Sequence, residues 1–227
     1  MTKSSIPPTP NRKDYTENEA YQAQARANET DIFSVNDPFA LLTDWMAEAR
    51  EKELNDSNAM SLATVDADAN PDVRIVLLKS FDEKGFVFYS NAKSAKGQQI
   101  TENQNAALCL HWKSLRRQVR VRGKVSPVSN EEADAYFASR ARQAQLGAWA
   151  SQQSDELESR EKFEAEIESV TNEYEGKDVP RPPHWRGWRV SPERIEFWRD
   201  RPFRLHDRLV FSNFHPADGW TKQRLYP

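Results

Sequence analysis

The chain has 227 residues, of which 37% are hydrophobic and 30% are charged, so it is long enough to bury a core and fits one or two domains. Its net charge of −3 excludes a global field that attracts nucleic acid or anionic lipid. A single cysteine excludes an internal disulfide. The chain also lacks a membrane-length apolar run and a signal-peptide core, which together indicate a cytoplasmic protein with no membrane partner.

The first 36 residues differ in composition from the rest of the chain. Residues 1–36 are rich in Pro, Asn, Thr, Gln and charged side chains and show little apolar periodicity, which predicts a flexible N-terminal arm. Within this arm, residues 12–15 form a compact charged and aromatic cluster, which composition alone attributes to solubility. The folded domain is predicted to span residues 37–227.

A helix is predicted at the start of this domain. Asp37 is a suitable N-cap, Pro38 suits the first helical position, and apolar residues recur at spacings of three and four from Phe39 to Ala49. The helix is expected to end near residues 53–55. Its apolar stripe indicates core packing.

Three short apolar runs follow, at residues 60–65, 73–79 and 86–89, separated by turn-forming residues. Their β-branched and aromatic content predicts a β-meander. The middle run is unusual because Arg74 and Lys79 bracket its apolar centre. Spacing alone favours two solvated ends of a buried strand; the alternative is a strand that carries anion-binding groups into a ligand site.

A short polar helix is predicted within residues 92–103, with Ser94 as its cap and Lys96 in its first turn. Free backbone N–H groups at such an N-terminus favour a phosphate. Residues 106–112 and 118–128 are predicted to pair as a hairpin. The basic face of its second strand suggests nucleic-acid binding, but no aromatic residues are interleaved on it, so a solvated or subunit-facing surface is preferred.

Two more helices and four strands complete the prediction. Ser129 opens a helix that runs towards Arg140, a loop rich in amides and hydroxyls follows, and a second helix spans roughly residues 155–175. The strands are expected at residues 187–190, 194–198, 208–211 and 220–225. Helices that flank antiparallel hairpins predict an α+β fold with a β-barrel core.

The residues that remain for chemistry are mostly cationic. The sequence has no glycine-rich nucleotide motif and no nucleophile elbow, and its four histidines lack metal-ligand spacing, so no metal site is predicted. Arginine and lysine side chains cluster near predicted strand ends, and guanidinium groups match phosphate oxygens. Seven tryptophans add flat apolar walls. The residues therefore indicate a small phosphorylated aromatic ligand.

Several co-linear segments resemble the pyridoxamine (pyridoxine) 5′-phosphate oxidase family, from about residue 37 to the C-terminus. They are RIVLLK (74–79), DEKGFVFYSN (82–91), RQV (117–119), GAWASQQS (147–154), IEFW (195–198), RLHDR (204–208) and the terminal RL-x-P. The resemblance implies an α+β, FMN-binding split β-barrel, antiparallel and Greek-key-like with flanking helices. It also implies a homodimer with FMN at the subunit interface and a C-terminal dimerisation region.

The same resemblance implies roles for individual residues. The residues expected to bind FMN are Arg74, Ile75, Val76, Leu77, Leu78, Lys79, Tyr89, Ser90, Lys96, Gln118, Gln153, Ser154, Trp198 and Arg208. Those expected to bind substrate are Arg12, Tyr15, Lys79, Tyr136, Arg140, Arg204, Leu205 and His206, with Arg204 and His206 as the catalytic pair that places the substrate. Residues 12–15 match the family's N-terminal RxxY, a mobile segment that folds over the site.

The implied activity is the oxidation of pyridoxamine and pyridoxine 5′-phosphates to pyridoxal 5′-phosphate, with O₂ as acceptor and H₂O₂ as product. Three segments depart from the family pattern, at four positions: Ala95 replaces an arginine, Ala141 and Ala144 replace the proline and serine of RPRxS, and Arg186 replaces a glycine. A lost charge-assisted bond weakens ligand binding by roughly 1.5–3 kcal/mol, so we expect weaker FMN and substrate binding.

Other functions stay open at this point. One is a flavin oxidase of the same fold acting on another aromatic substrate, as in phenazine-pathway relatives. A second is a non-catalytic protein that binds FMN or pyridoxal phosphate. A third, nucleic-acid binding through residues 116–124, is disfavoured by the net charge of −3.

Overall fold

The computed structural model describes residues 6–7, 9–214 and 219–227, so residues 1–5 and 8 of the predicted arm lie outside the described part. The chain divides into two compact units. The first comprises Met1–Ser57, Leu110–Arg120 and Arg194–Pro227, and the second comprises Asn58–Cys109 and Val121–Glu193.

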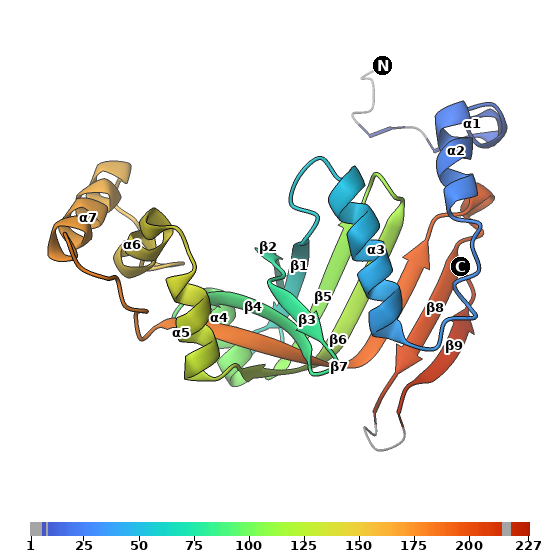
Figure 1. Ribbon diagram of the computed structural model, residues 1–227. Helices are drawn as coiled ribbons and strands as arrows, with labels where there is room; N and C mark the ends of the chain where they lie inside the picture. Colours follow the sequence, from blue (N-terminus) through green and yellow to red (C-terminus); the bar gives the residue numbers. More distant parts are fainter. Residues whose placement is uncertain (1–5, 8, 215–218) are drawn as a thin grey trace. The chain divides into compact units, whose positions relative to one another are not determined.

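The strands form a nine-stranded sheet within the described residues, in the order β2-β1-β5-β6-β7-β4-β3, with β8 beside β7 and β9 beside β8 (Figure 1). Their bounds are β1 Ala59–Val65, β2 Pro71–Leu77, β3 Ser80–Asp82, β4 Gly85–Asn91, β5 Asn105–Trp112, β6 Arg117–Pro127, β7 Trp185–Arg199, β8 Asp207–Ser212 and β9 Thr221–Leu225. The pairs β1–β2, β3–β4, β4–β7, β7–β8 and β8–β9 are antiparallel. Three strands, β5, β6 and β7, contribute residues to both units.

Seven α-helices and one 3₁₀ turn accompany these strands in the described part of the chain. They are α1 Arg12–Thr16, α2 Glu19–Ala27, α3 Pro38–Lys52, α4 Ala95–Glu102, α5 Asn130–Ala138, α6 Arg142–Ala150, α7 Arg160–Glu173 and η1 Pro202–Arg204. The predictions of α3 with its Asp37 cap, α4 with its Ser94 cap and α5 with its Ser129 cap are confirmed. In each, the cap side chain accepts a backbone N–H that the helix leaves without an acceptor.

The core of the first unit is built from aromatic side chains around α3. Trp45 of α3 makes edge contacts with Trp112 of β5 and Phe197 of β7, at centroid distances of 6.5 and 5.2 Å. Phe197 in turn contacts Phe211 of β8 at 5.9 Å. Edge-to-face rings of this kind add stability beyond the area they bury, so this cluster anchors α3 and β8 on the sheet.

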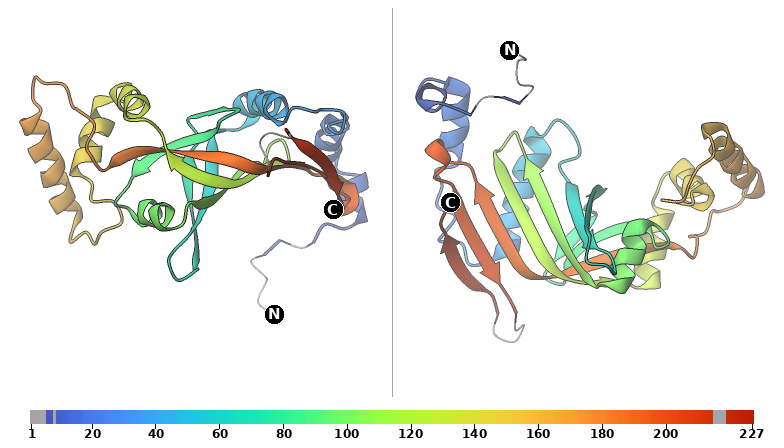
Figure 2. Two further views of the ribbon diagram at one scale, coloured as in Figure 1. Left: turned by 90° about the horizontal axis from the view of Figure 1, so that it is seen from below. Right: turned by 180° about the vertical axis from the view of Figure 1, so that it is seen from behind.

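The second unit is organised by β4, which is buried along almost its whole length. Phe86, Val87 and Phe88 are fully buried, and the strand pairs with β7 from Phe86↔Val190 to Asn91↔Trp185. Helices α6 and α7 of the same unit lie side by side in both views of Figure 2. The register of β4 and β7 brings the ends of both strands, with Tyr89 and Trp185, close to α5.

Four secondary-structure predictions need correction. The meander was wrong because β2 and β4 are not neighbours in the sheet: β2 is the end of the strand order beside β1, while β4 pairs with β3 and β7. Residues 12–27 of the predicted arm are mostly helical, as α1 and α2, capped by Asn11 and Asn18. The amide-rich loop after Arg140 contains the helix α6, and the strands predicted at 187–190 and 194–198 are one strand, β7.

Candidate functional site

A cavity with a volume of about 610 Å³ lies in the second unit. Its walls come from β2, β4, α4, α5, α6 and α7, from the start of β7, and from the segments that follow β2, α5 and α6. The lining residues are Ile75, Val76, Leu77, Lys79, Tyr89, Ser90, Asn91, Lys96, Tyr136, Arg140, Ala144, Gly147, Ala148, Ser151, Gln153, Phe163 and Trp185. A cavity of this size accommodates a ligand with an aromatic ring system and a polar tail.

One wall of the pocket is a stack of aromatic rings. Tyr89 and Tyr136 are parallel within 11° at a centroid distance of 4.0 Å, and Tyr89 and Trp185 are parallel within 9° at 5.1 Å. Burial, with smaller contributions from Glu132 and Tyr136, raises the pKa of Tyr89 to about 12, so its phenol stays protonated at neutral pH. The wall therefore offers flat apolar surface together with the neutral hydroxyl group of Tyr89.

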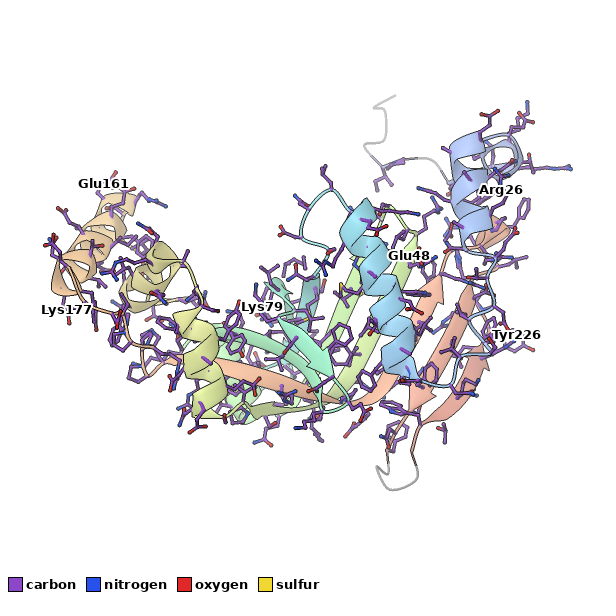
Figure 3. All side chains as sticks on the ribbon, in the orientation of Figure 1. Arg26, Glu48, Lys79, Glu161, Lys177 and Tyr226 are labelled. Carbon is purple, nitrogen blue, oxygen red and sulfur yellow. The ribbon has the colours of Figure 1, made fainter. Side chains whose placement is uncertain are left out.

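Three cations face this pocket, and none of the described residues that line it is acidic. Arg140 lies over the Trp185 ring at 5.0 Å, and Lys79, labelled in Figure 3, lies over the Tyr136 ring at 5.9 Å. The Nη1 atom of Arg140 is buried and has no hydrogen-bond partner, while burial lowers the pKa of its guanidinium. An unpaired buried donor of this kind is costly, so the pocket favours an anion.

Lys96 stands at the first turn of α4, where the backbone also favours negative charge. Its Nζ atom donates to Gln153 Oε1 at 2.7 Å and to Ser94 Oγ at 3.1 Å. Burial first, and then the nearby charge of Arg74, lower the pKa of this ammonium group. The Asp72 carboxylate opposes this shift only in part, so the pKa of Lys96 stays lowered, and an added anion such as a phosphate would stabilise the ammonium group.

Arg74 lies behind this group and does not line the cavity. Its guanidinium donates to Thr64 Oγ1 at 2.5 Å, to Gln99 Oε1 at 3.2 Å and to the carbonyl oxygen of Leu62 at 3.2 Å, and it forms an ion pair with Asp72. These contacts fix the guanidinium beside α4. In the absence of a ligand, Arg74 therefore affects the pocket through its charge, which lowers the pKa of Lys96.

The structure brings together most of the predicted ligand residues of the second unit. Those that line the pocket are Ile75, Val76, Leu77, Lys79, Tyr89, Ser90, Lys96, Tyr136, Arg140 and Gln153. Leu78 is buried in the core and contributes no pocket surface, and Ser154 lines a neighbouring cavity of about 380 Å³. The preferred interpretation of the middle run as a buried strand was wrong, because Val73 and Ile75 of β2 are 64% and 65% exposed.

The other predicted residues lie in the first unit, and several meet at the connection between β7 and β8. The rings of Trp198 and His206 are 4.6 Å apart. Phe203 and Arg204 both adopt positive φ, at 58° and 63°, which is unusual for residues with side chains and marks a constrained turn. Leu205 in the same turn is 66% exposed.

Burial lowers the pKa of His206, against an opposing effect of the nearby Asp200 carboxylate. The imidazole is therefore neutral at neutral pH. Its Nδ1 atom is 3.3 Å from the backbone nitrogen of Arg201 and 3.2 Å from Asp200 Oδ1. A neutral imidazole next to two ordered partners is suited to place a bound ring.

The remaining predicted residues of this unit have different surroundings. Arg208 donates to the buried carboxylate of Glu196 at 2.8 Å, and Gln118 is half-buried on β6. Tyr15 of α1 packs on Phe203 at a centroid distance of 5.0 Å, while Arg12 is exposed on the same helix. The RxxY segment thus contacts the turn that holds Arg204 and His206.

Sequence reasoning missed several residues that line the pocket. Trp185, Asn91, Gly147 and Phe163 were not considered as ligand contacts. Gly147 stood in a segment interpreted as a loop, and Phe163 in the apolar seam of a helix. A signal was present for α6, because residues 142–150 are mostly strong helix formers.

Two further findings apply to the described part of the chain only. No group of three or more His, Cys, Asp or Glu side chains there is arranged to hold a metal ion. No helix in that part is both long and apolar enough to cross a membrane.

The pocket fits a flavin mononucleotide on two observations. The closely spaced Arg74 and Lys96 charges stand at a helix N-terminus, which suits a phosphate. Ile75, Val76 and Leu77 line an apolar side of the cavity, which suits a flat ring. The unpaired Nη1 of Arg140, beside the stacked rings, is a donor suited to a second anion.

Comparison with protein families gives two matches. A family model described as pyridoxamine 5′-phosphate oxidase matches residues 46–199, more than half of the chain. A second model, described as the pyridoxine 5′-phosphate oxidase C-terminal dimerisation region, matches residues 185–227.

Curated relatives named pyridoxine/pyridoxamine 5′-phosphate oxidase match almost the whole chain. The protein of Rhodopseudomonas palustris strain HaA2 is 58% identical over 204 residues, which cover 90% of this chain and 96% of the relative. The protein of Maricaulis maris is 56% identical over 222 residues, which cover 98% and 97%.

Two solved structures share the fold. PhzG from Burkholderia lata, in complex with tetrahydrophenazine-1-carboxylic acid, is 30% identical with a TM-score of 0.79 and covers 86% of this chain and 94% of its own. An FMN-binding protein of Nostoc punctiforme, described as related to pyridoxamine 5′-phosphate oxidase, is 18% identical with a TM-score of 0.68, and the match covers 86% and 100% of the two chains. The predicted fold class, an antiparallel α+β split barrel, is confirmed.

Proposed function

Because the chain belongs to the pyridoxamine 5′-phosphate oxidase family, we propose that it oxidises pyridoxamine and pyridoxine 5′-phosphates to pyridoxal 5′-phosphate, with FMN as cofactor and O₂ as electron acceptor. The observation that carries this proposal is the pocket of the second unit. It combines three cations, no acidic lining residue among those described, and a wall of parallel aromatic rings. Such a pocket suits two ligands that are each aromatic and phosphorylated.

FMN would be held at the α4 end of the pocket. Lys96 and Arg74 would neutralise its phosphate, with Gln153 and Ser90 as polar partners, and Ile75, Val76, Leu77 and Tyr89 would pack beside the ring system. The resemblance adds Leu78, Lys79, Gln118, Ser154, Trp198 and Arg208 as further FMN contacts, and these stay predictions.

The phosphorylated vitamer would be held by Arg140, Tyr136 and Lys79. Arg140 has a buried donor without a partner, and Tyr136 and Lys79 lie on the same aromatic wall. We assign the vitamer phosphate to Arg140 because a guanidinium fork forms two parallel bonds to phosphate oxygens. Arg12, Tyr15, Arg204, Leu205 and His206 stay predicted substrate contacts, with Arg204 and His206 as the pair that places the ring.

When bound, FMN would supply the redox chemistry: its ring would accept a hydride equivalent from the C4′ carbon of the vitamer, with O₂ as the final two-electron, two-proton acceptor and H₂O₂ as product. The protein contributes binding, orientation and exclusion of water. Arg140 and Lys79 neutralise the substrate phosphate, and the neutral imidazole of His206 accepts or donates one hydrogen bond to the ring without adding charge. No strong general base is assigned.

We also propose that the enzyme is a homodimer with FMN at the subunit interface. Residues 185–227 match a dimerisation region, which supports an assembly of two copies. In addition, Val73, Ile75 and Leu77 expose one apolar side of β2, at 64%, 65% and 37%. A row of exposed apolar side chains on one strand is typical of an interaction surface, and two of these residues also line the pocket.

The test is direct. The purified protein should be yellow and should release pyridoxal 5′-phosphate and H₂O₂ in equal amounts from pyridoxine 5′-phosphate, with ammonia as an additional product from pyridoxamine 5′-phosphate. A yellow protein that turns over neither vitamer would refute the oxidase and leave a binding protein.

A second flavin reaction is tested in the same assay. The 30% identical PhzG structure holds a tetrahydrophenazine carboxylic acid, so a reduced phenazine carboxylate is the competing substrate. The retained Lys79, Tyr136 and Arg140 favour the phosphorylated vitamer, because that phenazine ligand is not a phosphate ester. Oxidation of the phenazine at a higher kcat/KM than either vitamer would reverse this assignment.

A further inference from the structure

The carboxylate of Asp200 has several partners in the first unit, in the segment between β7 and β8. Its side chain is only 12% exposed. Oδ2 accepts from the hydroxyl group of Tyr21 at 3.1 Å and from Nε of Arg116 at 2.6 Å. Oδ1 lies 3.2 Å from Nδ1 of His206. One buried carboxylate therefore contacts a helix of the N-terminal segment, the β5–β6 turn and the imidazole.

The contact with the N-terminal segment is specific. Tyr21 is the buried residue of α2, and its ring also lies 4.4 Å from the guanidinium carbon of Arg116. Burial first, and then the Asp200 charge, raise the pKa of Tyr21 to about 12, so its hydroxyl group remains a donor at neutral pH. Asp200 is thus one of the acceptors that hold α2 on this unit, together with the carbonyl oxygens of Ser114 and Leu115, which accept from Gln24 and Asn28.

A second contact supports the same docking. Tyr15 of α1 packs against Tyr21 at 5.3 Å and against Phe203 at 5.0 Å, next to Arg204 in the constrained turn. Figure 1 shows α1 and α2 beside the connection between β7 and β8. Residues 12–27 therefore reach the turn that precedes His206 through aromatic packing, and Asp200 through a hydrogen bond.

The Nδ1 atom of His206 has two alternative partners. When it carries no proton it accepts from the backbone N–H of Arg201 at 3.3 Å, and when protonated it donates to Asp200 Oδ1 at 3.2 Å. The Asp200 carboxylate therefore favours a proton on Nδ1, whereas the Arg201 N–H favours the tautomer with its proton on Nε2. The charged groups around this imidazole are Asp200, Arg204, Arg116 and Asp207.

We propose that Asp200 is a positioning residue that couples the docking of residues 12–27, through Tyr21, to the orientation of the His206 imidazole. This inference rests on the proposed function only for the role of His206 in substrate placement. The docked α2 orients one oxygen of the carboxylate, and the other oxygen orients the imidazole. Loss of either contact leaves the turn at residues 200–206 less ordered and weakens substrate binding before it affects the chemical step.

The main test is Asp200→Asn, which keeps the shape of the side chain and removes its charge. The protonation of His206 is followed by NMR titration of its ring, and its resonances are assigned with the variant His206→Gln. The docking of α2 is followed by the rate of trypsin cleavage after Arg26, an exposed residue near the end of that helix (Figure 3). In Asp200→Asn the His206 midpoint moves to lower pH, because a nearby anion is lost. Cleavage after Arg26 accelerates about fivefold, in line with a lost charge-assisted bond of about 1 kcal/mol.

Kinetics separate positioning from a general loss of structure. In Asp200→Asn the KM for pyridoxine 5′-phosphate rises about tenfold while kcat changes less than threefold, as expected for a lost binding interaction. Tyr21→Phe removes only the hydroxyl group and accelerates cleavage after Arg26 about twofold. This second variant decides whether the hydrogen bond holds α2 if Asp200→Asn does not fold.

Asp82→Asn is the matched control, since it breaks an exposed ion pair with Arg189 in the second unit. It should leave the His206 midpoint and the cleavage rate unchanged. Wild-type His206 titration and Arg26 cleavage retained in Asp200→Asn would overturn the inference. A wild-type enzyme inactive on both vitamers would refute the proposed function, while these two measurements would still decide the role of Asp200.

Discussion

An ion-pair network in the first unit and the pocket of the second unit use arginine and lysine in opposite ways. In the network, three arginines each meet a carboxylate: Arg116 pairs with Asp200, Arg199 with Asp207, and Arg208 with Glu196. In the pocket of the second unit, Lys79, Lys96 and Arg140 face one another across a cavity whose described lining contains no acid. The same residue types thus build a neutralised network in one unit and an uncompensated positive surface in the other.

This difference separates structural from ligand-binding cations. A buried guanidinium with a carboxylate partner has its desolvation cost offset within the protein. The pocket has no such compensation: the Arg140 Nη1 atom is unpaired, and burial lowers the pKa of both Arg140 and Lys96. In the proposed complex the ligands supply the missing negative charge, since a phosphate group at each end would balance these cations.

The largest loss of activity is expected when Arg140 is replaced. Arg140→Met removes the cation that we assign to the substrate phosphate, and the loss of a charge-assisted bidentate contact of about 2.7 kcal/mol lowers kcat/KM for pyridoxine 5′-phosphate about 100-fold. Steady-state measurement of H₂O₂ release tests this. FMN affinity should stay within about twofold of wild type, since Arg140 is assigned to the other ligand.

Arg142→Met is the matched control. This arginine lies two residues later, as the first residue of α6, and it donates to the carbonyl oxygens of Lys177 and Tyr174 and does not line the pocket. Equal losses of kcat/KM in the two variants would show that Arg140 acts only through the local structure.

The contribution of the first unit's ion pairs to stability is tested at Glu196, whose side chain is only 3% exposed. Glu196→Gln keeps the shape of the side chain but weakens charge-assisted bonds from Arg120 and Arg208, so we expect a loss of about 2 kcal/mol in the free energy of unfolding. Urea unfolding measures it. Glu164→Gln, at an exposed pair with Arg160, should cost less than about 0.5 kcal/mol.

The difference in unfolding free energy between the wild type and Glu196→Gln should change with pH in one direction. Burial alone raises the pKa of Glu196, but hydrogen bonds from Arg120 and Arg208 outweigh it and lower the pKa below the ordinary value of 4.5. The stabilisation by Glu196 is therefore fully present above pH 4.5 and is lost as the pH falls through the lowered folded-state pKa. A difference between wild type and Glu196→Gln that grows on acidification would contradict this assignment.

Lys96 tests the cofactor end of the pocket. Lys96→Met should weaken FMN binding about tenfold, because one charge-assisted contact to the phosphate is lost while Arg74 remains. Quenching of flavin fluorescence on titration with apoprotein measures the affinity. Lys93→Met, an exposed lysine three residues earlier that does not line the pocket, should bind FMN like wild type; similar losses in both variants would exclude a local role for Lys96.

Much of the fold was predictable because local signals and burial agreed. Asp37, Ser94 and Ser129 each cap the helix expected from their sequence context, and the hairpin of β5 and β6 follows an apolar alternation that the sheet buries. The β-meander was not predictable, because strand order depends on which distant strand pairs with β4, and β7 lies about 100 residues later. Helix α6 was missed since Ala141 stands at its N-cap position and gives no capping signal.

The site was predictable to a smaller extent. Residue chemistry indicated cations and aromatic walls, and the family resemblance located most of the pocket residues, including Tyr136 and Arg140. Trp185 and Phe163 were missed because their place in the wall depends on tertiary packing at α5 and α7. Asp200 was missed as a contact of Tyr21 because 179 residues separate them in the sequence.

The smallest expected effect concerns the position at which this chain has one cation fewer than its family pattern. Ala95 is the exposed first residue of α4, directly before Lys96. Ala95→Arg should tighten FMN binding about threefold, less than a buried contact provides, because water screens a charge at this exposed position. Ala95→Leu, a long side chain without charge, should leave the affinity at the wild-type value, and the gain of the arginine variant should shrink at high salt. An arginine variant with wild-type affinity would mean that Lys96 and Arg74 already neutralise the phosphate. The pocket would then carry only as much positive charge as its ligands balance.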